Sequence, residues 1–212
     1  AADIIVDILG KAGIKAEVVS DTKKLADISL QLAQDAEAAG IEGDGFRIMP
    51  GKDGRSAVVS AGTVFGLTQA AYRIADNIGV RVGKVDIPLI AGNPTVELRA
   101  GGFGGGDFEV DFPYGSDTDW KHAFDCLISS GMNVVADLGM WSNWKMPVSY
   151  KYMPELKTDS PDAFDESSGT KFSEIDANRE HGLKLLKYLH DRGVRVWQWM
   201  PIGCVPTTYA KV

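Results

Sequence analysis

Apolar residues in the first half of the chain recur at helical spacing in two places, with β-rich segments between them. The first helical pattern covers residues 1–12 and ends at Gly13, and the second begins after Thr63, a candidate N-cap, and stops before Gly79. The turn Gly51–Gly54 is a strong hairpin signal. Together these patterns predict an α+β unit in which the second helix lies across a sheet. The strands are expected at residues 16–19, 27–32, 45–49 and 56–60.

The second half of the chain changes to an alternating order of strands and helices. A long helix is expected from the N-cap Ser173 to Arg192, with Leu183, Leu186 and Leu189 on its buried face and Gly193 just beyond its end. Such alternation implies parallel strands with right-handed crossovers, as at the start of an open doubly wound sheet or a (β/α)8 barrel. The remaining expected elements are strands at 96–100, 133–140 and 194–202 and a helix with the stripe Trp120, Phe124, Leu127 and Ile128 that ends at Gly131.

The two halves differ in amino-acid composition, and the change falls near Pro94. Residues before it are rich in Ala, Gly, Ile and Val and include no Trp, whereas all five tryptophans come later. The turn-forming sequence Ala-Gly-Asn-Pro at residues 91–94 is typical of a linker. We therefore expect an α+β unit over residues 1–94 and the start of an α/β unit over residues 95–212.

Composition and charge narrow the classes of partner. The 212 residues are 44% hydrophobic and 24% charged, which is typical of a globular protein. The net charge of −7 disfavours nucleic acid, because phosphate backbones are repelled. No apolar run approaches the roughly 18 residues that cross a bilayer, and Cys126 and Cys204 lack metal-ligand spacing. We therefore expect neither nucleic acid nor a membrane as a partner, and neither a metal ion nor a cofactor in a site. The sequence does not decide between a cytoplasmic and an extracytoplasmic location.

A glycine-rich run at residues 101–106 raises the question of nucleotide binding. A G-x-G-x-x-G fingerprint that begins at Gly102 would need a glycine at the position of Asp107, and no G-x-x-x-x-G-K-[ST] motif occurs. A nucleotide-binding sheet is therefore disfavoured. A zinc site or a catalytic triad finds no support either, because no H-x-x-x-H spacing occurs among His122, His181 and His190.

Strand parity singles out two charged residues. On the strand expected at 133–140, Asp137 alternates with a fully apolar set that suits the helix layer, so Asp137 should point into a barrel or to its carboxyl rim. On the strand expected at 96–100, Arg99 likewise alternates with apolar residues. One interpretation is a structural Arg99–Asp137 ion pair, because inward charges need partners. The other is a polar site at the barrel mouth, where active sites of such folds lie.

Aromatic residues gather in and before the long connection at residues 142–172. Connections beyond roughly 15 residues without regular structure are usually functional or disordered. Tryptophan beside polar groups offers a sugar ring a flat apolar platform, so Trp141 and Trp144 are candidate sugar contacts. Trp197 and Trp199 either contact a sugar or belong to the barrel core, and the sequence favours neither interpretation.

Residues 44–81 contain the segments DGFRI, SAVVSAGTVFGLTQAAYRI and GVR. They resemble the accessory domain that precedes the catalytic barrel in family 20 β-hexosaminidases and in the α-glucuronidases of families 67 and 115. The stretch SSGMNVVADLGMW at 129–141 is similar to the second strand of such barrels. The resemblance aligns Arg99 of ELRAG with the Arg of the first barrel strand, but the Arg-Gly pattern of hexosaminidases is not kept, since Ala100 follows it.

The resemblance implies a glycoside hydrolase: an α+β accessory domain followed by the beginning of a (β/α)8 TIM-type barrel, incomplete in this chain. It implies that Arg99 contacts ring hydroxyls and that the catalytic acid pair is expected after Val212, so that the 212 residues alone are inactive without the rest of the barrel or a partner chain. The alternative is a non-catalytic carbohydrate-binding or scaffold module that retains the fold. The expected substrate-binding residues are Arg99, Asp107, Asp137, Trp141 and Trp144.

Overall fold

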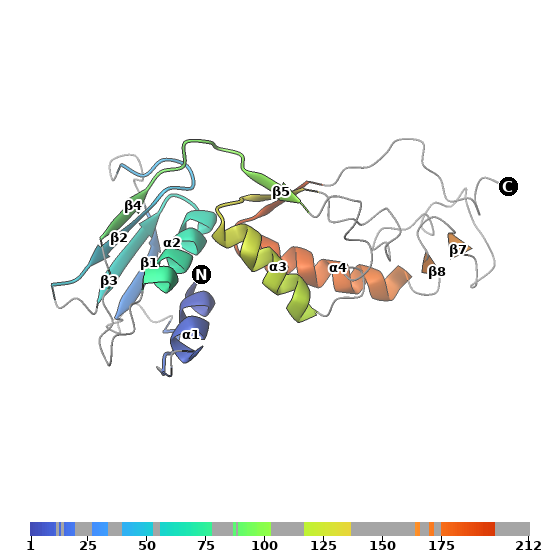
Figure 1. Ribbon diagram of the computed structural model, residues 1–212, viewed down its shortest axis with the longest axis horizontal. Coiled ribbons are helices and arrows are strands. Elements are labelled where there is room, and N and C mark those ends of the chain that lie inside the picture. Colours follow the sequence, from blue (N-terminus) through green and yellow to red (C-terminus); the bar gives the residue numbers. More distant parts are fainter. Residues whose placement is uncertain are drawn as a thin grey trace. The chain divides into compact units, whose positions relative to one another are not determined.

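The computed structural model divides into two compact units, each described by itself (Figure 1). The first comprises Ala1–Arg99 with Asp191–Gly193, and the second comprises Ala100–His190 with Val194–Val212. That these units are an accessory domain and the start of a barrel stays a prediction. The structure describes residues 1–11, 13, 15–19, 27–33, 40–52, 56–77, 87, 89–102, 117–136, 164–165, 170–171 and 175–197.

A four-stranded sheet in the order β1-β3-β2-β4 forms the centre of the first unit. β2 and β3 pair antiparallel, and the Gly51 N–H donates to the Ser56 carbonyl at 2.7 Å where the hairpin turn begins, which confirms the predicted pairing. β1 runs parallel to β3, and β4 runs antiparallel to β2. The strands are β1 (Ile28–Leu32), β2 (Phe46–Pro50), β3 (Ala57–Ala61) and β4 (Ile90–Gly92).

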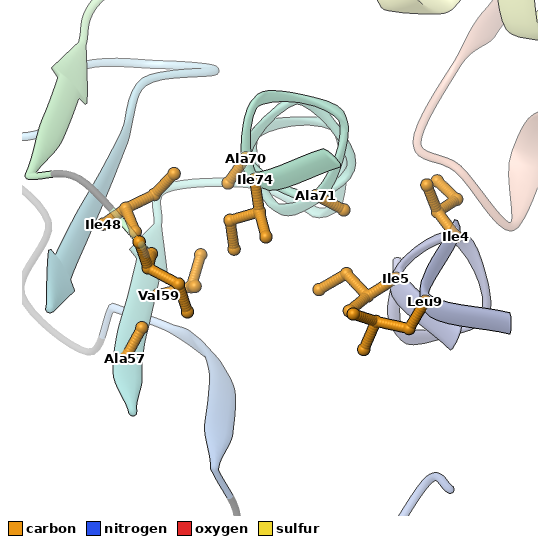
Figure 2. Close-up of a cluster of buried hydrophobic side chains, with 10 residues drawn as sticks. Ile4, Ile5, Leu9, Ile48, Ala57, Val59, Ala70, Ala71 and Ile74 are labelled. Atoms are coloured by element: carbon orange, nitrogen blue, oxygen red, sulfur yellow. The ribbon is translucent and has the colours of Figure 1, made fainter. Parts of the chain in front are cut away.

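Two helices bury one face of this sheet. α2 (Val64–Asn77) packs against β1, β2 and β3, and α1 (Ala2–Lys11) packs against α2. The Thr63 hydroxyl accepts the Gly66 N–H at 3.1 Å, which confirms Thr63 as the N-cap of α2. The predicted position of this helix across the sheet is also confirmed. Figure 2 shows the core between the three layers, made by Ile48, Ala57 and Val59 of the strands, Ala70, Ala71 and Ile74 of α2, and Ile4, Ile5 and Leu9 of α1.

Two sequence predictions in this unit are wrong. Residues 16–19 form no strand: Val18 is exposed, and Ala16 packs against the core without strand pairing. Residues 91–94 are not a free linker, because Ala91 and Gly92 belong to β4 and pair with β2. The Asn93 side chain then accepts the Glu42 N–H at 3.1 Å and donates to the Gly40 carbonyl at 3.0 Å. Backbone pairing along β2 overrides the local turn preference of this sequence.

An ion pair within the first unit joins Arg192 to α1. Arg192 is almost fully buried, and its Nη2 donates to Oδ2 of Asp3 at 2.9 Å. The other oxygen of Asp3 accepts the Ala1 amine at 3.1 Å. Partial burial alone would raise the pKa of Asp3, but the hydrogen bond from the amine and the positive charges of the amine and Arg192 together hold it below 3.8.

We expect Asp3→Asn to lower the free energy of unfolding by about 1 kcal/mol near neutral pH, because buried Arg192 loses its charged partner. Since the folded-state pKa of Asp3 lies below the unfolded one, the carboxylate stabilises the fold above about pH 4. This contribution is lost as the pH falls through the folded-state pKa. Urea unfolding of wild type and variant across acid pH should give stabilities that converge at low pH. A constant difference would contradict the assignment.

Three parallel strands in the order β5-β6-β9 form one sheet of the second unit, which confirms the predicted parallel pairing. Gly131 and Gly193 follow the two helices with φ of 94° and 74°, as their predicted positions after the helix ends require. No helix of the described ranges is both long and apolar enough to cross a membrane. The elements are β5 (Ala100–Gly102), α3 (Asp117–Ser129), β6 (Val134–Ala136), α4 (Ile175–His190) and β9 (Arg195–Trp197).

Three predicted details of this unit differ from the structure. The first strand begins at Ala100, so residues 96–99 are not part of it. Leu183 is 51% exposed, because the buried residues of α4, Gly182, Leu185 and Leu189, lie roughly 100–160° around the helix from it. The connection at 142–172 contains a short antiparallel pair, β7 (Phe164–Asp165) with β8 (Thr170–Lys171).

Gly101 shows which face of the parallel sheet the helices cover. A Cβ at Gly101 would lie 3.0 Å from Cδ2 of Leu127 on α3. Gly101 is in register with Val135, and Val135 with Val196, so this row faces the helices. The prediction that Val134 and Ala136 contact the helix layer is therefore wrong. The prediction assigned the two faces from Asp137, which follows β6, whereas Val134 and Val135 within β6 are both apolar and both buried.

Candidate functional site

Arg99 is the predicted substrate-binding residue that the structure describes. It precedes the first residue of β5 and belongs to the first unit. The other four, Asp107, Asp137, Trp141 and Trp144, lie outside the described residues, and their roles stay predictions.

The guanidinium of Arg99 is held by groups of its own unit. Its Nη2 donates to Oδ2 of Asp44 at 3.3 Å, with only 21% of the Arg99 side chain and 11% of the Asp44 side chain exposed. Its Nη1 donates to the backbone carbonyls of Val96 and Glu97. Because Arg99 is not in a strand, the parity argument does not apply to it, and Asp44 is an ion-pair partner that this argument did not identify.

Asp44 connects Arg99 to the start of α2. The Thr63 hydroxyl donates to Oδ1 of Asp44 at 2.7 Å, so the residue that caps α2 also contacts the carboxylate. The guanidinium carbon of Arg99 lies 5.7 Å from the centroid of the buried Phe65 ring, within cation–π distance. We call Asp44, Thr63, Phe65 and Arg99 the Asp44 network. Both oxygens of this nearly buried carboxylate accept hydrogen bonds, which suits a structural role.

Glycines around the Asp44 network allow its backbone segments to touch. A Cβ at Gly62 would lie 2.4 Å from the Gly43 carbonyl oxygen, and one at Gly66 would lie 2.8 Å from the Gly45 carbonyl oxygen. Such separations are too short for any side chain. The segments that carry the family resemblance, DGFRI and SAGTVFG, therefore hold β2, β3 and the start of α2 together.

No group of three or more His, Cys, Asp or Glu side chains in the described ranges is arranged to hold a metal ion. The exposed His122 and Cys126 lie one turn apart on α3, with Nε2 and Sγ separated by 3.9 Å. On the side of α3 that contacts α4, the Tyr188 hydroxyl donates to Asp125 at 2.7 Å, and Lys121 lies 5.5 Å from the Tyr188 ring centroid. These contacts tie the two helices together.

Sequence reasoning left Trp197 undecided, and the structure now gives its position. It is the last residue of β9, it is 50% exposed, and it stands in register with Ala136 of β6. Asp44 was missed as a partner of Arg99, although it begins the DGFRI segment. The signal for Asp44 was its place in that motif, whereas no local signal decided between sugar contact and barrel core for Trp197.

No protein-family model and no curated protein sequence match this chain. Solved structures do resemble it. A family 20 exo-β-N-acetylglucosaminidase from Vibrio harveyi, in complex with N-acetylglucosamine, matches 92% of this chain and 30% of its own with a TM-score of 0.60 and 12% identity. A family 89 glycoside hydrolase from Clostridium perfringens matches 99% of this chain and 25% of its own, with a TM-score of 0.65 and 11% identity.

A third similar structure is a family 138 enzyme that targets pectin rhamnogalacturonan II, with a TM-score of 0.62 and 18% identity over 99% of this chain and 24% of its own. The present chain thus spans about a quarter to a third of the length of these enzymes. At such identities the likeness concerns the fold. The chain has a glycoside hydrolase-like fold.

Proposed function

We propose that this chain supplies the accessory unit and the first barrel strands of a glycoside hydrolase that acts on an oligo- or polysaccharide of the hexosaminide or glucuronide type. The observation that carries this proposal is the fold likeness, which extends over 92% to 99% of the chain in three glycoside hydrolase families. The parallel strands β5, β6 and β9, with α3 and α4 between them, support it, because TIM-type barrels are built from such units.

In this proposal the saccharide binds at the carboxyl ends of the parallel strands, where barrel enzymes place their active sites. Arg99 precedes β5 and is held by Asp44, so we propose a structural role for it in place of sugar contact. Asp107 follows β5 in the sequence, and Asp137, Trp141 and Trp144 follow β6. These four residues stay the proposed substrate contacts.

We expect the 212-residue chain to bind saccharide weakly and to hydrolyse neither p-nitrophenyl N-acetyl-β-glucosaminide nor p-nitrophenyl glucuronide. Hydrolysis needs two carboxylates on either side of the scissile bond, and the three parallel strands of the described residues are fewer than the roughly eight strands that close a barrel. Release of p-nitrophenol and retention on an immobilised glycan panel are the measurements. Turnover that disappears in Asp137→Asn would contradict the expected inactivity.

The same assays on the complete gene product separate the hydrolase from a non-catalytic module. Turnover by the complete product supports the hydrolase, and glycan retention without turnover supports a carbohydrate-binding or scaffold module. A complete product that neither retains nor cleaves any glycan would overturn both.

A further inference from the structure

The carboxyl ends of the three parallel strands meet in one row of the sheet. Gly102 of β5 is in register with Ala136 of β6, and Ala136 with Trp197 of β9. The preceding row, which includes Gly101, faces α3. Because successive residues of a strand point to opposite faces, the row with Trp197 lies on the face away from the helices. The neighbours of Trp197 along this row are an alanine and a glycine, the two smallest residues.

The side chain of Trp197 is half exposed to solvent, and it differs in this from the other described tryptophan. Trp197 is 50% exposed, whereas Trp120 on α3 is 5% exposed. A half-exposed indole beside small residues presents a flat apolar surface, which suits the apolar face of a pyranose ring. Arg195 is exposed on the same face two residues earlier. Its guanidinium carries five N–H donors for sugar hydroxyls or a carboxylate.

We propose that Trp197 is a stacking platform for a pyranose ring at the carboxyl ends of β5, β6 and β9, with Arg195 donating hydrogen bonds beside it. The proposal rests on the proposed glycoside hydrolase function and adds the residue that holds the ring. N-acetylglucosamine and glucuronic acid share the pyranose face that would stack on Trp197. They differ in the carboxylate, which only glucuronic acid offers to Arg195.

A competing explanation is that Trp197 belongs to a barrel core and is covered by another strand. β9 is at one edge of the three-stranded sheet that the structure describes, so a further strand paired there would compete with a sugar for the ring. The two explanations differ in what happens to the Trp197 indole when a sugar is added, and the test uses that difference.

The indole N–H signals of the five tryptophans in a ¹H–¹⁵N correlation spectrum provide the measurement. Trp197→Phe removes one signal and so assigns Trp197. Titration of the wild-type chain with N-acetylglucosamine, and separately with glucuronic acid, should move that signal most. Trp197→Ala should weaken binding of both sugars about tenfold, equivalent to about 1.4 kcal/mol, while Trp197→Phe keeps most of the affinity.

Two further variants complete the design. Arg195→Gln should weaken the binding of glucuronic acid more than that of N-acetylglucosamine. Leu183→Ala, which changes an equally exposed apolar residue on α4 of the same unit, should leave both affinities unchanged.

Sugar binding that leaves the Trp197 signal in place, or that survives Trp197→Ala, would overturn the platform while the proposed function stands. If Trp197→Ala does not fold, the wild-type signal and the Trp197→Phe affinity decide the same question. A folded wild-type chain that binds neither sugar also overturns the platform, and turnover by the complete gene product then judges the proposed function separately.

Discussion

Gly62→Ala should lower the free energy of unfolding of the first unit by about 3 kcal/mol, at the upper end of the range for an overpacked site. The new Cβ would lie 2.4 Å from the carbonyl oxygen of Gly43, and a backbone atom cannot turn aside as a flexible side chain can. Either β3 or the loop that carries Gly43 must shift, which would disturb the nearby Asp44 network. Urea unfolding followed by circular dichroism measures the loss.

The matched control is Gly10→Ala in α1. Apart from its chain neighbours and the backbone of its own helix, no atom lies within 4 Å of a Cβ at Gly10, so the same substitution meets open space there. Alanine is the better helix former, and we expect a gain of about 0.5–1 kcal/mol. Changes of the same sign at the two glycines would show that close backbone packing at Gly62 is not the cause.

Asp44→Ala should destabilise the first unit by about 2–3 kcal/mol, somewhat below the cost of breaking a fully buried ion pair. The variant leaves the Arg99 guanidinium and the Thr63 hydroxyl without the carboxylate that both contact. Asp44→Asn, which keeps an oxygen for Thr63 but loses the charge, should fall between wild type and Asp44→Ala. A double-mutant cycle with Arg99→Met should give a coupling energy of about 1–2 kcal/mol.

Asp76→Ala is the control for charge removal in the same unit. Asp76 pairs with Arg73 at 3.7 Å on the exposed side of α2, where solvent screens the interaction. Its loss should cost less than about 0.5 kcal/mol. If Asp44→Ala is equally mild and Arg99→Met weakens glycan retention without loss of stability, Arg99 returns to the saccharide site that the resemblance implied.

Local sequence signals were sufficient where short-range geometry decides structure. The cap at Thr63, the glycines after α3 and α4 and the spacing of apolar residues in α2 each act within a few residues, and the structure has all of them. The resemblance carried by DGFRI and SAGTVFG likewise indicated the glycoside hydrolase-like fold. The close contacts at Gly62 give a physical reason for this motif, because no side chain fits between the backbone segments that meet there.

Pairing between distant segments decided the remainder. Arg99 and Asp44 are 55 residues apart, and no pattern near Arg99 indicates that its guanidinium turns to Asp44. The strand β4 takes its place because β2 offers backbone partners to residues that alone resemble a turn. The close approach of Leu127 to Gly101 shows which face of the parallel sheet the helices cover. The sequence of β6 could not show this, because both faces of β6 are apolar. The row of Gly102, Ala136 and Trp197 exists only through the register of three strands, so periodicity could show helices and strands but not this surface.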